Sequence, residues 1–479
     1  MSITRALTSS MLVLVTGRVV TIAGTLAINA LLVRHLHATG FGEYRTVLAY
    51  LGFGALLANL GLPLIILREI SLKQADQARI LGSAMTLTML ATTAFLCMLL
   101  LVSWWLPLSH TVRLGMLLGL FGFVALGVHN VLFTLFQQRL QQRGPVLAEA
   151  LGAATLLLCI TLLALGNAGV LLCVAATTLS NVVTLAISWH YARRLVDIRP
   201  MMDWQEWQRL LKPAAPIALA NVLILLYYRC DIILLGLMKP MQEVGYYGIA
   251  SKMLDTLIGF SLLLTNLFMP LLSRHVHHDT RAFNKCMQSG LETLLIGMVG
   301  VLIIVQFYAE TIVTLIGGPQ AEPAAYPLRV LGILAVVASL SLMHRQGVTA
   351  YNQHHHLLVG YVAAVVCGVT AYMLLIPRFG GLGAALSLLV GETVVGLRAI
   401  WLLRKLGMVY KWSMLWKIAL AATATCFFLG VGRRYGMPWF MGMLGGPALY
   451  TTLLLAMQAI PVGLLLELVA PGKSALESR

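Results

Sequence analysis

The fold is decided by two similar stretches of sequence, GFGEYRTVLAYLGFGALLANLGLPLIILRE at residues 40–69 and EVGYYGIASKMLDTLIGFSLLLTNLFMPLLSRH at residues 243–275. Each stretch opens with glycine and tyrosine, continues as an apolar run and ends near a proline and a basic residue. The corresponding positions are Gly42 and Gly245, Tyr44 and Tyr247, Ala49 and Ala250 or Ser251, Pro63 and Pro270, and Arg68 and Arg274. This correspondence, with a small gap near the prolines, predicts an internal repeat.

The composition of the whole chain indicates a membrane protein. Of its 479 residues, 59% are hydrophobic and 10% are charged, whereas soluble domains contain roughly 45–50% apolar and about 25% charged residues. The net charge is +16, but so apolar a chain lacks the solvated basic face that tracks a nucleic acid. We therefore exclude a soluble domain and expect no nucleic-acid partner. The excess cations are expected in the loops of a polytopic membrane protein.

The apolar runs predict an all-α integral membrane protein with about fourteen transmembrane helices of roughly 20 residues each. The predicted spans are 8–32, 44–67, 80–103, 113–136, 146–165, 168–190, 214–238, 245–271, 286–308, 328–350, 357–376, 381–402, 413–431 and 444–468. None has the alternating pattern of a strand in an outer-membrane barrel. The repeated stretches begin the second and the eighth span, so both copies run in the same direction. This predicts two six-helix lobes related by a parallel pseudo-two-fold repeat, plus two C-terminal helices.

The distribution of loop charges predicts the orientation in the membrane. With the N-terminus inside, the cytoplasmic connections are the basic ones. They carry Arg68, Lys73, Arg79, Arg139, Arg143, Arg193, Arg194, Arg199, Arg209, Lys212, Arg274, Arg281, Lys285, Arg404, Lys405 and Lys411. The opposite connections carry less than half as many cations, so the positive-inside rule predicts that both termini lie in the cytoplasm. Every outer connection is short, which argues against a membrane glycosyltransferase or polymerase with a large external domain.

One substantial polar segment, residues 191–212, separates the two halves. Within it, Trp204, Trp207, Leu210 and Leu211 recur on one helical face with charges opposite, which predicts an amphipathic helix at the cytoplasmic surface. The predicted domains are an N-terminal lobe at 1–195, a linker helix at 196–212, a C-terminal lobe at 213–405, and two additional helices with a short tail at 406–479.

At four places the chain resembles a known family. The segments are RHLHATGFGEYRT (34–46), LGLPLIILREIS (60–71), YYRCDIILLG (227–236) and EVGYYGIASKM (243–253). They resemble the polysaccharide-repeat flippases of the multidrug/oligosaccharidyl-lipid/polysaccharide exporter (MOP) superfamily, and the resemblance extends over essentially the whole chain. It implies two six-helix lobes with two further helices. It also implies transfer of undecaprenyl-diphosphate-linked sugar repeats from the cytoplasmic to the outer leaflet, with possible functional coupling to a polysaccharide polymerase.

A few ionisable residues remain inside the predicted spans, where a charge costs from ~3 to over 10 kcal/mol unless it is paired or solvated. They are Arg18, Arg229, Asp231, Lys252, Asp255, Arg345, Glu392 and Arg398. Arg345 and Arg398 lie near helix ends and are expected to extend toward the interface. Lys252 and Asp255 are three residues apart and can pair on one helix, which competes with a cavity role for Lys252. Arg229 and Asp231 are two apart and are expected to diverge.

Three cations form the predicted substrate site. Arg18 lies near the middle of the first span and has no acidic neighbour one helical turn away. We expect Arg18 and Arg229, on the first helices of the two lobes, to bind the substrate diphosphate in a central cavity, with Lys252 as a weaker third member. A guanidinium offers a planar fork of donors that matches phosphate oxygens. The structural alternative for Arg18 is an ion pair between helices. The structural alternative for Arg229 is pairing with Asp231.

Energy coupling requires a carboxyl group that titrates, and Asp231 and Glu392 are the candidates for a proton or sodium site. The alternative for each is a structural ion pair with a nearby arginine. No nucleophile and base, phosphate-binding loop or zinc spacing is present, so we expect neither an enzyme nor a cofactor nor a metal. The runner-up function is a cation-coupled multidrug antiporter of the same superfamily, against which the central arginines count.

Overall fold

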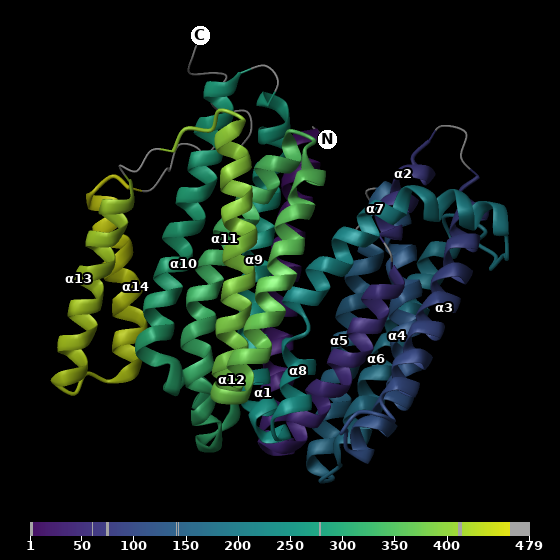
Figure 1. Cartoon of the computed structure of the whole chain (residues 1–479), viewed down its shortest axis with the longest axis horizontal. Helices are drawn as coiled ribbons and strands as arrows, with labels where there is room; N and C mark the ends of the chain where they lie inside the picture. Colours follow the sequence, from purple (N-terminus) through teal and green to yellow (C-terminus); the bar gives the residue numbers. More distant parts are fainter. Residues whose placement is uncertain are drawn as a thin grey trace. The chain divides into compact units, whose positions relative to one another are not determined.

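The computed structural model describes residues 3–59, 61–72, 76–139, 141, 143–276, 279–410 and 414–459, with side chains from residue 24 onward. The described residues form helices and connections without a strand (Figure 1). The α-helices are α1 (Ile3–Asn59), α2 (Leu62–Ile70), α3 (Gln77–Val102), α4 (His110–Gln138), α5 (Arg143–Leu165), α6 (Val170–Arg193), α7 (Trp204–Tyr228), α8 (Asp231–Met238), α9 (Met241–His275), α10 (Thr280–Gly317), α11 (Ala325–Ala350), α12 (Leu358–Lys405), α13 (Leu415–Arg434) and α14 (Trp439–Ala456). Two short 3-10 helices, η1 (Pro319–Ala324) and η2 (His354–Leu357), precede α11 and α12.

These helices confirm the predicted all-α membrane fold. Eleven helical segments of the described chain are long and apolar enough to cross a membrane, and twelve if the bent pair Gly24–Asn59 and Leu62–Ile70 is one span. Two predicted spans, 357–376 and 381–402, merge into α12, which bends at Gly380 where φ is 55°. The first predicted span and most of the second lie in α1, which bends at His37, and the end of the second lies in α2.

Breaks and caps explain where several helices begin. Gly61, with φ of 73°, separates α1 from α2, and only a residue that tolerates positive φ fits there easily. The side chains of Asp76, Ser109 and Asp279 accept hydrogen bonds from the first free N–H groups of α3, α4 and α10. Polar N-caps at the ends of apolar runs therefore set these boundaries.

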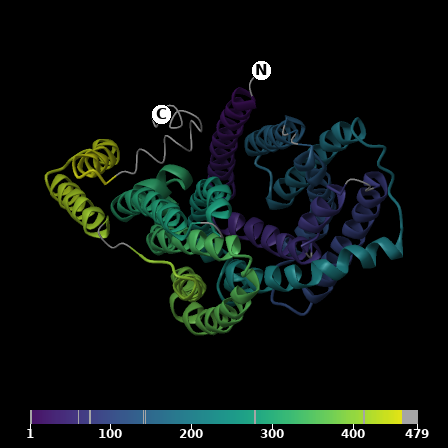
Figure 2. The same ribbon diagram turned by 90° about the horizontal axis from the view of Figure 1, so that it is seen from above.

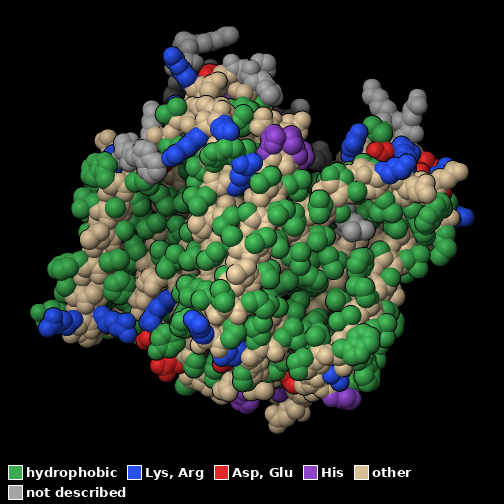
Figure 3. Space-filling model, in the orientation of Figure 1, with side chains coloured by type: hydrophobic (Ala, Val, Ile, Leu, Met, Phe, Trp, Pro, Cys, Tyr) green, Lys and Arg blue, Asp and Glu red, His purple; other side chains and the backbone are tan. Residues whose placement is uncertain are grey.

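The chain divides into two compact units, residues 16–248 and residues 249–479 together with 1–15. In the first unit, α2, α3, α4 and the start of α7 share an apolar core. In the second unit, α13 and α14 pack as a pair against α10 (Figure 2). In each unit, on the face shown in Figure 3, hydrophobic side chains cover the flanks of the helices while Lys and Arg lie mainly near helix ends. The lobe boundaries at residues 195, 212 and 405 stay a prediction from the repeat.

The polar segment between the halves differs from the predicted surface helix. The helix that begins at Trp204 continues to Tyr228 through Pro213 and Pro216, so it is the start of a membrane-length helix. Its Leu210 is fully buried in the core of the first unit, and the Trp207 indole donates a hydrogen bond to the Ser83 carbonyl at 3.0 Å. Of the predicted apolar face, Trp207, Leu210 and Leu211 pack on protein, whereas Trp204 is 68% exposed.

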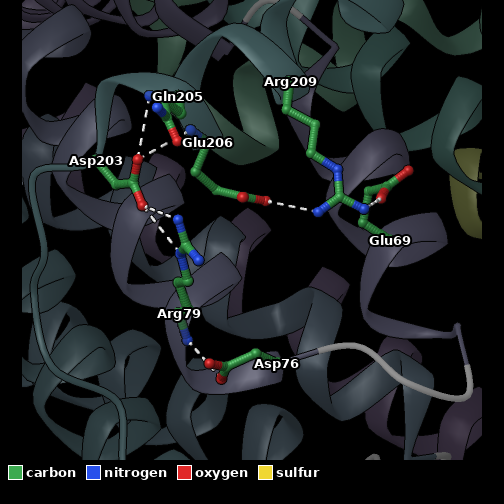
Figure 4. A network of polar contacts seen from close by, with 7 residues as sticks. All are labelled: Glu69, Asp76, Arg79, Asp203, Gln205, Glu206 and Arg209. Carbon is green, nitrogen blue, oxygen red and sulfur yellow. Dashed lines mark hydrogen bonds and ion pairs between the residues drawn. The ribbon is translucent and has the colours of Figure 1, made fainter.

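A network of ion pairs fixes the start of α7 (Figure 4). Asp203 caps α7 by accepting from the Gln205 and Glu206 backbone N–H groups, and it also pairs with Arg79 of α3, whose Nε lies 2.9 Å from a carboxylate oxygen. The hydrogen bond from the Glu206 backbone, followed by the Arg79 contact, lowers the pKa of Asp203. One turn further on, Arg209 contacts both Glu206 and Glu69 of α2, with its pair to Glu69 at 2.8 Å.

Candidate functional site

Arg18, the first predicted substrate ligand, lies in α1. Its side chain lies outside the described residues, so its role stays a prediction.

Arg229 does not lie on a continuous span. The predicted helix 214–238 breaks at residues 229–230, where α7 ends and α8 begins at Asp231. The expectation that Arg229 and Asp231 diverge on one helix is therefore wrong, because the helix does not continue between them. Arg229 is exposed, and its guanidinium carbon lies 5.4 Å from the centre of the Tyr228 ring. A broken helix leaves backbone groups outside the regular ladder, an arrangement seen where transporters bind substrates and ions.

Asp231 begins α8 as a buried carboxylate, 5% exposed. Its Oδ2 accepts a hydrogen bond of 2.6 Å from the hydroxyl group of Tyr247, in the first turns of α9. Tyr247 is itself fully buried. The structure thus brings one of the two predicted coupling carboxylates together with the tyrosine of the second repeat.

Lys252 and Asp255 lie one helical turn apart on α9, and both are half-buried. Their spacing is the one predicted for an intrahelical pair. Two interpretations of Lys252 therefore stay open: a partner of Asp255 on the same helix, or a weaker third ligand of the diphosphate.

Glu392, the second predicted coupling carboxylate, is 1% exposed in α12. One of its oxygens lies 3.2 Å from a guanidinium nitrogen of Arg345 in α11. The Arg345 side chain is 18% exposed, so the expectation that it extends to the interface is wrong, because a buried carboxylate attracts it inward. For Glu392 the geometry favours a structural partner of arginine over a freely titrating site.

The glycines that define the repeat lie against each other. A Cβ atom added to Gly42 would lie 1.8 Å from the backbone oxygen of Met241, and one added to Gly245 would lie 1.9 Å from the backbone oxygen of Ala38. Ala38 and Met241 each precede the glycine of their own helix by one turn. The contact is therefore reciprocal, and the starts of the two repeated helices cross at backbone distance, which only glycine permits. We call this contact the glycine crossing.

The glycine crossing carries an arginine that the sequence analysis missed. A Cβ at Gly248 would lie 3.0 Å from Cγ of Arg45 and 3.4 Å from its Nε, so the half-buried Arg45 side chain lies over Gly248. The signal was present, since Arg45 is a cation within the second predicted span and Gly248 is its counterpart in the repeat. A half-buried cation packed against a glycine at the outer end of a span is a further candidate for a functional role.

Within the first unit, Arg45 near the start of one repeat and the buried Asp231 that contacts the start of the other supply a cation and a carboxylate, which can bind an anion and a coupling ion. Within the described residues no group of three or more His, Cys, Asp and Glu side chains is arranged to hold a metal ion.

The fold is shared with solved transporter structures. A lipid II flippase MurJ in an inward closed conformation superposes with a TM-score of 0.73 at 12% identity, over 93% of this chain and 97% of that one. The eukaryotic MATE transporter AtDTX14 gives a TM-score of 0.61 at 10% identity, over 83% of this chain and 94% of that one. An inward-facing multidrug resistance MATE family transporter of the MOP superfamily gives 0.60 at 15% identity, over 81% and 94%. A search of curated protein sequences gives no significant match.

Fold and buried charges define a polytopic membrane protein whose fold is shared with these solved transporters. Residues 7–276, more than half of the chain, match the model of a family described as polysaccharide biosynthesis protein. The chain belongs to this family, which confirms the resemblance found in the sequence.

Proposed function

We propose that this protein is a flippase that transfers undecaprenyl-diphosphate-linked oligosaccharide repeat units from the cytoplasmic to the outer leaflet for O-antigen, capsule or exopolysaccharide synthesis. The observation that carries the proposal is the match of residues 7–276 to the polysaccharide biosynthesis protein family. The similarity in fold to a lipid II flippase supports it. The protein lies in the bacterial inner membrane with both termini in the cytoplasm and supplies the polymerase machinery outside.

The diphosphate is bound by Arg18 and Arg229, with Lys252 as a weaker third member. A diphosphate carries several acceptor oxygens and at least two negative charges, which guanidinium groups match in a medium of low dielectric constant. The sugar occupies a hydrated cavity, while the prenyl chain stays in the bilayer, because removing it from lipid costs ~0.8 kcal/mol per CH₂.

Alternating access requires that the two repeats separate on the outer side during each cycle. Both partners of the glycine crossing follow predicted outer connections, so the crossing closes the outer side of the protein. Its closest contacts are between the backbones of the two helices, and the Thr46 hydroxyl also reaches the Met241 sulfur at 3.6 Å. Close packing at small residues of this kind suits a reversible gate.

Asp231 and Glu392 remain the proposed coupling residues. Both are buried carboxylates: Asp231 begins a short helix and accepts a hydrogen bond from Tyr247, and Glu392 lies beside Arg345. Burial of a carboxyl group favours its protonated form, which suits exchange with a proton or a sodium ion.

A cation-coupled multidrug antiporter is the second candidate, favoured by the buried carboxylate Asp231 and by the MATE transporters that share the fold. The deciding experiment removes the gene and locates the lipid-linked repeat unit. A flippase predicts that repeat units accumulate in the cytoplasmic leaflet and surface polymer is lost. Normal polymer together with increased drug sensitivity would support the antiporter instead.

Variants at the diphosphate site refine this test. Arg18→Ala is expected to abolish export while the folded protein persists in the membrane, and Arg229→Ala is expected to reduce it strongly. Arg113→Ala is the matched control, because Arg113 contacts backbone oxygens at the Ser103–Leu106 turn. Normal polymer in cells that carry only the Arg18 variant would rule out the proposed binding site.

A further inference from the structure

A cavity of about 440 Å³ lies within the second unit, among α10, α11, α12 and the first residues of α13. Leu291 and Leu295 of α10 and Leu397 and Ile400 of α12 form much of its wall. Leu397 is 60% exposed, so the cavity opens sideways between the helices. In a membrane-spanning region this opening faces lipid chains. The cavity falls within the range of about 300–1,000 Å³ that is typical of ligand pockets.

The polar lining residues gather at one end of these helices. Gln288 lies near the start of α10, His344 near the end of α11, and Arg404 is the penultimate residue of α12. Because neighbouring helices run in opposite directions, these positions lie at the same end, predicted as cytoplasmic. The arrangement of an apolar wall below a polar rim matches a lipid, whose headgroup stays at the interface while its chain lies deeper.

His344 has an unsatisfied acceptor that lines this cavity. The side chain is 5% exposed, and its Nδ1 lies 2.6 Å from the Leu340 carbonyl oxygen one turn earlier. That oxygen can only accept, so Nδ1 carries the proton and Nε2 holds a lone pair. Within the described part of the chain Nε2 has no hydrogen-bond partner. Leaving a buried acceptor without a partner is unfavourable, so a ligand that donates an N–H or O–H group is favoured here.

The other polar groups at this end combine both signs of charge. Glu292 accepts a hydrogen bond of 2.9 Å from the Gln288 side-chain amide, which leaves capacity on its carboxylate for further donors. Arg404 stacks its guanidinium 5.7 Å from the Tyr410 ring, which in turn lies 5.7 Å from the His344 ring. A carboxylate and a neutral histidine acceptor call for a cation with N–H donors, whereas Arg404 calls for an anion.

We propose that this cavity binds phosphatidylethanolamine, a phospholipid with a primary ammonium headgroup. The ammonium donates to Glu292 and to Nε2 of His344, the phosphate pairs with Arg404, and one acyl chain lies along the leucine wall. Choline headgroups have no N–H donor, and glycerol headgroups have no positive charge to balance Glu292. Because Met414 and Leu415 at the start of α13 complete the cavity, the bound lipid joins α13 to the helices of the lobe. The proposal does not depend on the transported substrate.

The test uses the full chain, purified and delipidated in detergent, and measures lipid binding by native mass spectrometry and by the shift in Tm. The probes are phosphatidylethanolamine, phosphatidylcholine and phosphatidylglycerol with identical acyl chains. The wild-type protein is expected to bind phosphatidylethanolamine at least tenfold more tightly than either of the others. Equal binding of the three lipids overturns the proposal, whatever the variants do.

Variants assign the recognition to these residues. Glu292→Gln and His344→Leu are expected to reduce the affinity for phosphatidylethanolamine to that for phosphatidylcholine. Arg404→Gln is expected to weaken the binding of all three lipids. Glu322→Gln, which changes an exposed carboxylate outside the cavity, is the matched control and keeps the preference. If His344→Leu does not fold, Leu295→Trp fills the apolar part of the cavity and is expected to abolish binding. Retention of the headgroup preference by Glu292→Gln overturns the proposal.

Discussion

Buried polar side chains pair differently in the two halves of the chain. In the first half, Tyr44 of α1 bonds the Thr177 hydroxyl of α6 at 2.8 Å, and His129 of α4 bonds the Ser188 hydroxyl of α6 at 2.8 Å. In the second half, Tyr247 donates to the Asp231 carboxylate, and Arg345 pairs with Glu392. In these four contacts the partners are neutral in the first half and include a carboxylate in the second, and the contacts of α4 with α6 and of α11 with α12 join equivalent helices.

This difference shows at which positions the two copies of the repeat have diverged from each other. Tyr44 and Tyr247 keep the same position after the glycine crossing, and both are buried, so packing is shared between the copies. The second copy places a buried carboxylate beside its tyrosine, whereas Tyr44 in the first copy contacts the Thr177 hydroxyl. If transport is coupled to an ion, the second half is the part of the molecule that can sense it.

The largest effect is expected at the buried ion pair of the second half. Glu392→Ala leaves the Arg345 guanidinium without its carboxylate and is expected to lower the free energy of unfolding by about 3–5 kcal/mol. His129→Ala removes a neutral hydrogen bond between helices of the first half and should cost less. Thermal unfolding of both variants in detergent makes the comparison. If Glu392→Ala lowered the free energy of unfolding by less than His129→Ala, the proposed difference between the two halves would be contradicted.

The glycine crossing gives the next effect and tests what the copies share. Gly42→Ala and Gly245→Ala force a methyl group onto a backbone oxygen, and overpacking of this kind costs about 1–3 kcal/mol. Because the crossing is reciprocal, the two variants should reduce stability and export to a similar extent. Gly259→Ala, also in α9 but with no atom within 4 Å of the added Cβ, is the control and should be tolerated. Unequal losses would show that the crossing is not symmetric.

The two tyrosines provide a finer comparison. Tyr247→Phe removes a donor from a buried carboxylate, which costs about 1.5–3 kcal/mol if Asp231 is ionised, whereas Tyr44→Phe removes a neutral hydrogen bond worth about 1 kcal/mol. Denaturation of the two variants at neutral pH measures the difference. Equal losses would indicate that Asp231 is protonated in the folded protein, and combining Tyr247→Phe with Asp231→Asn should then add little.

The smallest effect concerns the connection between the halves at Asp203. The pKa of this carboxyl is lowered in the folded protein by the Glu206 backbone N–H and by Arg79. A lowered pKa stabilises the fold above the ordinary value of about 3.9, and this stability is lost as the pH falls through the folded-state pKa. Asp203→Asn should therefore lower Tm slightly at pH 7 and have no effect in strong acid. If the difference in Tm between Asp203→Asn and the wild type did not change with pH, the lowered pKa of Asp203 would be contradicted.

Local pattern predicted most of the fold. The apolar runs predicted the helices, and the glycines, tyrosines and prolines at 40–69 and 243–275 predicted the repeat. Contacts between helices were not predictable to the same degree. Arg345 looked like a residue near a helix end, because nothing in the neighbouring sequence reveals that α12 brings Glu392 beside it. The break at 229–230 was missed because YYRCD continues an apolar run without a proline or glycine.

The candidate site was predicted in its residue types rather than in its arrangement. Asp231 was recognised from its position in an apolar run, but its partner Tyr247 comes from the next helix. Arg45 is the second residue of its predicted span, so the sequence does not distinguish it from a cation of the adjoining connection. The reciprocity of Gly42 and Gly245 became visible only once the two helices were seen to cross.

The most direct measurement of the central claim places the purified protein in liposomes with a fluorescent polyprenyl-diphosphate oligosaccharide. A membrane-impermeant glycosidase added outside digests only the glycans in the outer leaflet. A flippase predicts that digestion proceeds beyond the outer-leaflet fraction in liposomes with wild-type protein, and stops at that fraction with Arg18→Ala or with empty liposomes. The flippase function would be contradicted if digestion stopped at the outer-leaflet fraction in liposomes with folded wild-type protein. This comparison is made in the presence of proton and sodium gradients of either direction.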